Sequence, residues 1–80
     1  MVAQGALAMD VDTTEKTITA FVQQVRARLD EAAATARAAQ ACADAGTVKK
    51  AVEITLDLEQ LLYESNTLLN AMSLIHRLGT

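Results

Sequence analysis

The scarcity of helix-breaking residues is the feature that most constrains the fold of this chain. The 80 residues include no proline, and Gly46 is the only glycine between residues 6 and 78. Proline and glycine are the residues that most often end helices and form turns. Alanine and leucine, which are strong helix formers, are abundant, whereas the aromatic residues are only Phe21 and Tyr63. The sequence therefore predicts long helices with very few connections.

The position of Gly46 divides the chain into two helical stretches. We expect an all-α fold, an antiparallel hairpin of helices at residues 13–43 and 48–78, preceded by a flexible leader at residues 1–12. Glycine readily adopts the left-handed conformation that closes a helix. A single helix running through Gly46 is the alternative, at a cost of only about 1 kcal/mol for the glycine. The hairpin forms one domain, residues 13–80.

Residues at the helix ends support these boundaries. Asp12 followed by Glu15 has the spacing of a capping box, which predicts the start of the first helix. Thr47 is placed to cap the second helix. Lys49 and Lys50 oppose the positive end of that helix but would lie beside the carbonyl end of the first one. This arrangement favours a hairpin.

The first helix has a narrow apolar seam. Its apolar residues follow alternating steps of four and three, a spacing typical of coiled-coil contacts. Phe21 flanks this seam, and alanine dominates it near the turn. The members of the predicted seam are Ile18, Val22, Val25, Leu29, Ala32, Ala36, Ala39 and Ala43.

The second helix is apolar over a wider arc. One seam consists of Ala51, Ile54, Leu58, Leu61, Ser65, Leu68, Met72 and Ile75. A second seam, one residue over, consists of Val48, Val52, Leu62 and Leu69, and the arc is widened by Leu56, Leu74 and Leu78. An ordinary surface helix has an apolar stripe about 100° wide. The second helix therefore needs neighbours on two sides, and the first helix supplies one.

Chain length makes self-association the expected solution. A chain of 80 residues builds only a marginal core, and its lone cysteine, Cys42, allows no internal disulfide. We expect a homodimer that forms a four-helix bundle with the second helix inside. Cover by a different protein is the alternative. The predicted interface comprises Leu58, Leu61, Leu62, Ser65, Asn66, Leu68, Leu69, Met72 and Ile75.

Two polar residues interrupt the seams of the second helix at one level. Ser65 lies in the first seam and Asn66 lies in the second. A buried polar residue in a heptad seam can fix register and oligomeric state. Alternatively, the Ser65 hydroxyl bonds to the carbonyl of Leu61 and Asn66 is peripheral. The sequence leaves both interpretations open.

Charged residues suggest one further surface. Glu53, Asp57, Gln60 and Glu64 form an acidic stripe on the second helix, which is either a solvated face or a docking face for a basic partner. On the first helix, the spacing predicts local ion pairs of Arg26 and Arg28 with Asp30 and Glu31.

No residue pattern indicates catalysis or a cofactor. His76 is the only histidine and is expected to complement the carbonyl end of the second helix, while Cys42 is expected to be a small buried apolar residue. Two such ligands are too few for a zinc site. We therefore expect no enzyme activity, no metal and no cofactor.

The charge balance narrows the partner class. A net charge of −3 with no basic face argues against nucleic-acid binding, and no stretch approaches the ~20 apolar residues of a membrane span. The lone cysteine, without a secretory signal, favours the cytoplasm. In outline the chain resembles the small acidic helical hairpins among secretion co-chaperones. That likeness is one of architecture, with no shared motif.

These observations predict a protein–protein interaction module, such as an adaptor, a small chaperone or a regulatory subunit. It would act through the apolar faces of the second helix and through self-association. The alternative is an inhibitor or antitoxin-like protein that binds a specific partner through its acidic face.

Overall fold

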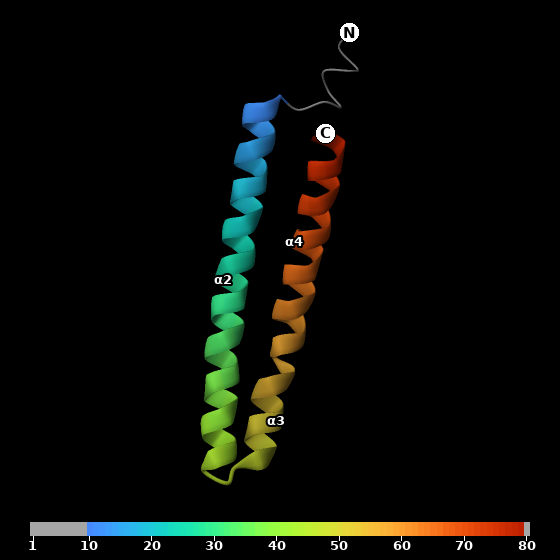
Figure 1. Cartoon of the computed structure of the whole chain (residues 1–80). Helices are drawn as coiled ribbons and strands as arrows, with labels where there is room; N and C mark the ends of the chain where they lie inside the picture. Colours follow the sequence, from blue (N-terminus) through green and yellow to red (C-terminus); the bar gives the residue numbers. More distant parts are fainter. Residues whose placement is uncertain (1–9, 80) are drawn as a thin grey trace.

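The computed structural model describes residues 10–79, and helices make up nearly all of them. Helix α2 spans Val11–Asp44, α3 spans Val48–Leu56 and α4 spans Leu58–Gly79. Figure 1 shows α2 running alongside α3 and α4 in the opposite direction, with one tight turn between α2 and α3. The predicted all-α antiparallel hairpin is confirmed. The predicted leader falls largely at residues 1–9, outside the described residues.

Helix α2 begins two residues earlier than predicted. The carboxylate of Asp10 accepts a hydrogen bond of 2.7 Å from the backbone N–H of Thr13, so Asp10 is the N-cap. Asp12 instead lies in the first turn and pairs with Lys16 at 3.0 Å. The cap prediction at Asp12 was therefore wrong, because two aspartates two residues apart both suit a helix start.

The turn at Gly46 closes α2 in the predicted way. Gly46 has a φ of 87°, and the N–H groups of Gly46 and Thr47 bond to the carbonyls of Ala43 and Cys42. This is a Schellman closure, and it excludes a single helix through Gly46. Thr47 does not cap α3 with its side chain. Its hydroxyl donates to the carbonyl of Cys42 at 2.8 Å, so it helps to end α2.

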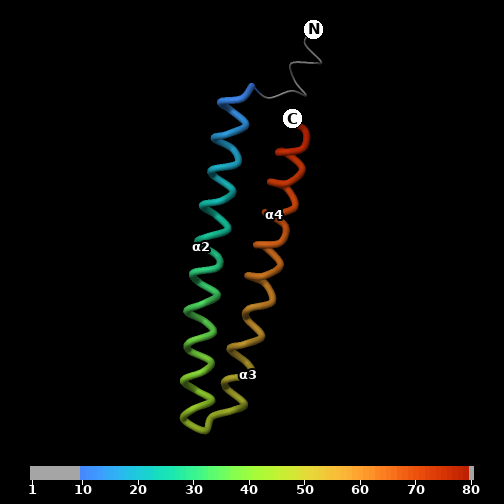
Figure 2. Tube along the Cα trace, viewed as in Figure 1, coloured from blue at the N-terminus to red at the C-terminus, as the bar shows by residue number. Residues whose placement is uncertain are grey.

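The second helical stretch is interrupted at Asp57. The N–H of Asp57 bonds to the carbonyl of Ile54, three residues back, which tightens the chain locally. The hydroxyl of Thr55 donates to the carbonyl of Ala51 at 2.8 Å, a contact that tends to bend helices. The prediction of one continuous helix over residues 48–78 was therefore wrong at this point. Figure 2 shows the trace passing from α3 into α4 without changing its general direction.

The two arms of the hairpin meet along heptad seams. On α2 the seam residues are Thr14, Ile18, Phe21, Val25, Arg28, Ala32, Thr35, Ala39 and Cys42, all buried or half-buried. On α3 and α4 they are Ala51, Ile54, Leu58, Leu61, Ser65, Leu68, Met72 and Ile75. The steps of four and three on both arms are those of antiparallel coiled-coil packing.

The seam of α3 and α4 matches the prediction, whereas that of α2 differs at every second position. Predicted seam members Val22 and Leu29 are about half exposed, and Ala36 and Ala43 are exposed as well. The predicted and observed seams share Ile18, Val25, Ala32 and Ala39. They differ by one residue at the alternate positions, which amounts to a rotation of α2 about its axis.

The hairpin by itself encloses very little. Among the described residues, the buried side chains are those of Ala39, Ala51 and Ser65, and no large side chain is fully buried. Most large apolar side chains are therefore half-exposed or exposed. This distribution is unusual for a chain that is about half apolar.

Candidate functional site: an apolar broad face

A shallow groove shows which residues of the two arms share a side. The groove has a volume of about 210 Å³ and lies between α2 and α3 near the turn. It is lined by Ala36, Ala39, Gln40, Ala43, Ala51, Thr55 and Leu58. Ala39, Ala51 and Leu58 belong to the inner seams. Ala36, Ala43 and Thr55 therefore lie on one side of the hairpin, next to those seams.

The same side carries bulky apolar residues farther from the turn. Steps of seven residues along a helix return to nearly the same face. Such steps lead from Ala36 to Leu29 and Val22, and from Thr55 to Leu62 and Leu69. We call this side the apolar broad face. Its large members, which are 44% to 60% exposed, are Val22, Leu29, Val48, Val52, Leu62 and Leu69.

The opposite side of the hairpin is polar. The Nε of Arg28 donates to the carboxylate of Glu64 at 3.0 Å, which links α2 to α4. The amide oxygen of Gln24 accepts from the same guanidinium at 2.7 Å, and the amide of Gln60 donates to Glu64 at 2.9 Å. We call this side the polar broad face.

These contacts also set the ionisation of Glu64. The hydrogen bond from Gln60, followed by that from Arg28, holds the pKa of Glu64 below its ordinary value. Both donors favour the charged carboxylate. Glu64 is therefore a negative charge already matched within the hairpin.

The predicted acidic stripe lies on the polar broad face or beside it. Glu53 pairs with Lys50 at 3.9 Å, and Glu64 pairs with Arg28. Asp57 lies at the break between α3 and α4. The prediction for Arg26 is confirmed, since it pairs with Asp30 at 3.6 Å. The local pair predicted for Arg28 was wrong, because its guanidinium crosses to α4 instead.

The structure divides the predicted interface residues into two groups. Leu58, Leu61, Ser65, Leu68, Met72 and Ile75 lie in the inner seam against α2, while Leu62, Asn66 and Leu69 are exposed. The hydroxyl of Ser65 is buried without a hydrogen-bond partner in the described structure. The bond to the carbonyl of Leu61, which the sequence left open, is therefore not made.

The residues that the sequence did not place on an exposed face are Val22 and Leu29. They were assigned to contacts with the second helix, although a seam one residue over, through Phe21 and Arg28, has the same spacing. The observed seam includes an arginine and two threonines, so it contains fewer apolar residues than the predicted one. The apolar residue count therefore favoured the wrong alternative.

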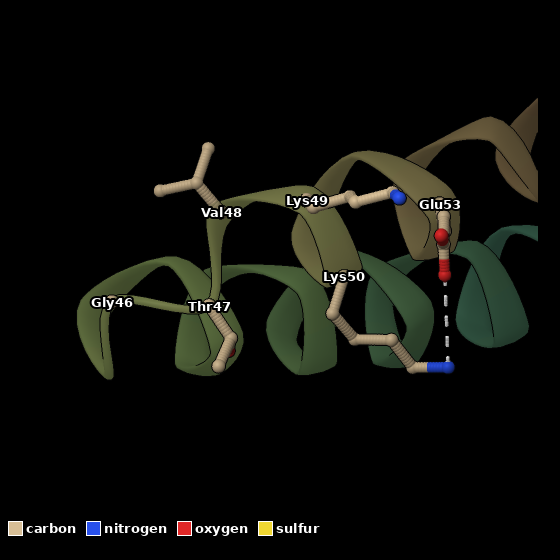
Figure 3. A pocket seen from close by; sticks show the side chains of 6 residues that line it. All are labelled: Gly46, Thr47, Val48, Lys49, Lys50 and Glu53. Carbon is tan, nitrogen blue, oxygen red and sulfur yellow. Dashed lines mark ion pairs between the residues drawn. The ribbon is translucent and has the colours of Figure 1, made fainter.

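A second hollow lies at the turn (Figure 3). It is open, has a volume of about 420 Å³ and is lined by Gly46, Thr47, Val48, Lys49, Lys50 and Glu53. Figure 3 shows the ammonium group of Lys50 directed toward the carboxylate of Glu53, the ion pair noted above. One of the two lysines at this hollow is therefore already paired.

The remaining candidate residues lie apart from one another. His76 is exposed in the last turns of α4, whereas Cys42 is half-buried near the turn at the other end of the hairpin. Within residues 10–79, no cluster of three or more His, Cys, Asp or Glu side chains could hold a metal ion. None of the helices described is both long and apolar enough to cross a membrane.

Some exposed apolar residues lie outside the apolar broad face. Leu56 and Tyr63 lie on the side of the second arm remote from α2, and Leu74 and Leu78 lie toward the polar broad face near the end of α4. Leu74 is 50% exposed, nearly the same as Leu62. It lies about 120° around the same helix from Leu62, at 100° per residue.

The apolar broad face is thus a surface suited to contact with another protein. Exposed leucine and valine side chains on two parallel rows can bury area against another helical surface. Comparison with known proteins adds no identity, since no family model, curated protein or solved structure matches the chain.

Proposed function

We propose that this chain is a non-enzymatic protein–protein interaction module that works through its apolar broad face, beginning with self-association. One observation carries the proposal. Over residues 10–79, the hairpin leaves six large apolar residues of one face about half exposed and buries no large side chain completely. Burying a single leucine or valine contributes about 1.5–3 kcal/mol. A partner that covers this face would therefore add stability that the single hairpin lacks.

The size of the face suits a macromolecular partner. Helix α2 is 34 residues long, which corresponds to roughly 51 Å at the helical rise. Two helices side by side, each ~10 Å wide, give a face on the order of 1,000 Å². A stable interface buries about 800 Å² per partner. The face therefore supports an adaptor, small chaperone or regulatory subunit. The lone cysteine fits a reducing cytoplasmic setting for such a module.

The acidic stripe offers weaker support for an inhibitor or antitoxin-like role. Glu53 and Glu64 have cationic partners within the chain itself, so part of the charge is already compensated. The partly exposed pair of Arg28 and Glu64 also links the two arms. Both facts favour a structural role for this side.

The experiment that tests the proposal compares two leucines of α4. Leu62→Glu places a charge on the apolar broad face, and Leu74→Glu places the same charge at similar exposure on the other side. Mass by light scattering and helicity by circular dichroism are measured for both variants. Leu62→Glu should lower the mass or the helicity, while Leu74→Glu should change neither. Unchanged mass and helicity in Leu62→Glu would contradict the proposal.

A further inference from the structure

The arrangement of polar residues on the apolar broad face suggests what covers it. Polar side chains interrupt the apolar rows at several levels. Arg26 lies between Val22 and Leu29 on α2, and Asn66 lies between Leu62 and Leu69 on α4. A cover must therefore offer polar groups at some levels and apolar groups at others.

The hairpin's own contacts show which residues of the two arms share a level. Arg28 bonds to Glu64, and a Cβ added at Gly79 would lie 3.2 Å from the Cγ2 of Thr14. Residues of the two arms whose numbers add up to about 92 therefore share a level. By the same relation, Val22 is level with Leu69, Leu29 with Leu62, and Arg26 with Asn66.

We propose that a second copy of the chain covers the apolar broad face, with both turns at the same end and α2 lying on the partner's α4. This inference rests on the proposed function and specifies its partner. A two-fold axis parallel to the helices places each α2 residue opposite the partner residue at its own level. The result is an antiparallel four-helix bundle with the two arms overlapping along their whole length.

The sequence of the face fits this pairing. Val22 meets the partner's Leu69, and Leu29 meets the partner's Leu62. Between them, Arg26 meets the partner's Asn66, whose amide oxygen can accept a hydrogen bond from the guanidinium.

The same match of residues continues toward the end of the hairpin that is remote from the turn. Glu15 meets the partner's His76, and Thr19 meets the partner's Ser73. Polar groups thus face polar groups there, and the acid faces the imidazole. No pair of like charges is formed along this register.

The other two-fold arrangement, with the turns at opposite ends, places α2 on the partner's α2 and α4 on the partner's α4. When Val22 is aligned with the partner's Leu29 in that arrangement, Arg26 lies against the partner's Arg26. Sliding the copies so that Leu29 meets the small Ala36 brings Glu59 against the partner's Glu59. Each alternative therefore juxtaposes like charges, which is unfavourable at an interface.

Cysteine cross-linking distinguishes these arrangements. On a Cys42→Ser background, Arg26→Cys and Asn66→Cys are prepared as separate single-cysteine chains carrying different tags. Each chain is oxidised alone and after refolding together, and the products are separated by mass. A disulfide requires Cα atoms within about 7 Å, so linked pairs report neighbouring positions. Ala27→Cys, one residue around α2 from the face, replaces Arg26→Cys in the control mixture.

The expected result is a cross-linked heterodimer of Arg26→Cys with Asn66→Cys, with little product from either chain alone or from the Ala27→Cys mixture. Self-linking of Arg26→Cys or of Asn66→Cys would overturn the proposed arrangement. So would a dimer, established by its mass, that forms none of these links. A chain that stays monomeric at high concentration would overturn the proposed self-association itself, which keeps the two failures distinct.

Discussion

Arg28 and Glu64 join the two arms of the hairpin across its middle, with the guanidinium Nε 3.0 Å from the carboxylate oxygen. Arg28 occupies a position in the inner seam of α2 where its neighbours are Val25 and Ala32. Both charged side chains are about two-thirds shielded from solvent. The pair thus places a specific polar contact in an otherwise small and apolar seam, where it can fix the register of α2 against α4.

Breaking this pair should weaken the hairpin more than breaking a local one. We expect Arg28→Ala to lower the melting temperature by a few degrees, because Glu64 loses a partner on the other arm. Lys16→Ala is the control, since Lys16 pairs with Asp12 at 3.0 Å within α2 and both side chains are largely exposed. Double-mutant cycles for the two pairs measure the difference. Equal coupling in both cycles would contradict a special role for Arg28.

Acidification should destabilise the fold through two carboxylates. Hydrogen bonds from Thr13 to Asp10, and from Gln60 and then Arg28 to Glu64, hold the pKa of each carboxyl below its ordinary value. Their stabilising contribution is therefore complete above the unfolded-state pKa values, near 4, and is lost as pH falls through the lower folded-state values.

Urea unfolding between pH 7 and pH 2 measures this effect. The free energy of unfolding should fall as the pH drops below about 4. Glu64→Gln should reduce the slope in this range. A free energy that stays level down to pH 2 would show that these hydrogen bonds do not persist in solution.

Removing the buried hydroxyl of Ser65 should not harm the hairpin. Ser65 is 5% exposed, and its hydroxyl has no hydrogen-bond partner among the described residues. Ser65→Ala removes an unsatisfied polar group and should be neutral or stabilise the fold by about 1 kcal/mol. Asn70→Ala, at an exposed position of the same helix outside the apolar broad face, should change little. A clear loss of stability in Ser65→Ala would mean that the hydroxyl is bonded in solution.

The turn should tolerate asparagine better than alanine at Gly46. The φ of 87° is a left-handed conformation that costs residues with a Cβ about 1–2 kcal/mol. A Cβ added at this position would meet no atom within 4 Å beyond its chain neighbours, so the cost is one of backbone conformation. Thermal unfolding should rank wild type above Gly46→Asn, and Gly46→Asn above Gly46→Ala. A Gly46→Ala variant as stable as wild type would contradict this account.

Several features of the fold could be predicted from sequence because each depends on local chemistry. The turn follows from one glycine in a chain without proline. The inner seam of the second arm follows from the spacing of its leucines, and the pair of Arg26 with Asp30 follows from helical geometry.

The features that were missed depend on competition between local alternatives. The seam of α2 could be drawn through Val22 and Leu29 or through Phe21 and Arg28, and only the contact with Glu64 on the other arm distinguishes them. Thr47 could cap α3 or help to end α2, and its hydroxyl bonds to the carbonyl of Cys42 in α2. The break at Asp57 lies close to Thr55, whose hydroxyl donates to the carbonyl of Ala51.

The candidate face was therefore predicted only in part. Leu62, Asn66 and Leu69 were assigned to an interface from sequence, and they are exposed. Their companions Val22 and Leu29 join that face only when α2 is rotated into its observed seam. A surface shared by two helices depends on the rotation of both.

Sedimentation equilibrium of the wild-type chain over a dilution series tests the central claim most directly. If the hairpin is half of a fold, the mass should approach twice 8.5 kDa at high concentration. It should fall toward the single-chain mass on dilution, together with helicity, because the stability of such a dimer depends on protein concentration. A mass of 8.5 kDa at every concentration, with full helicity and cooperative unfolding, would contradict the account.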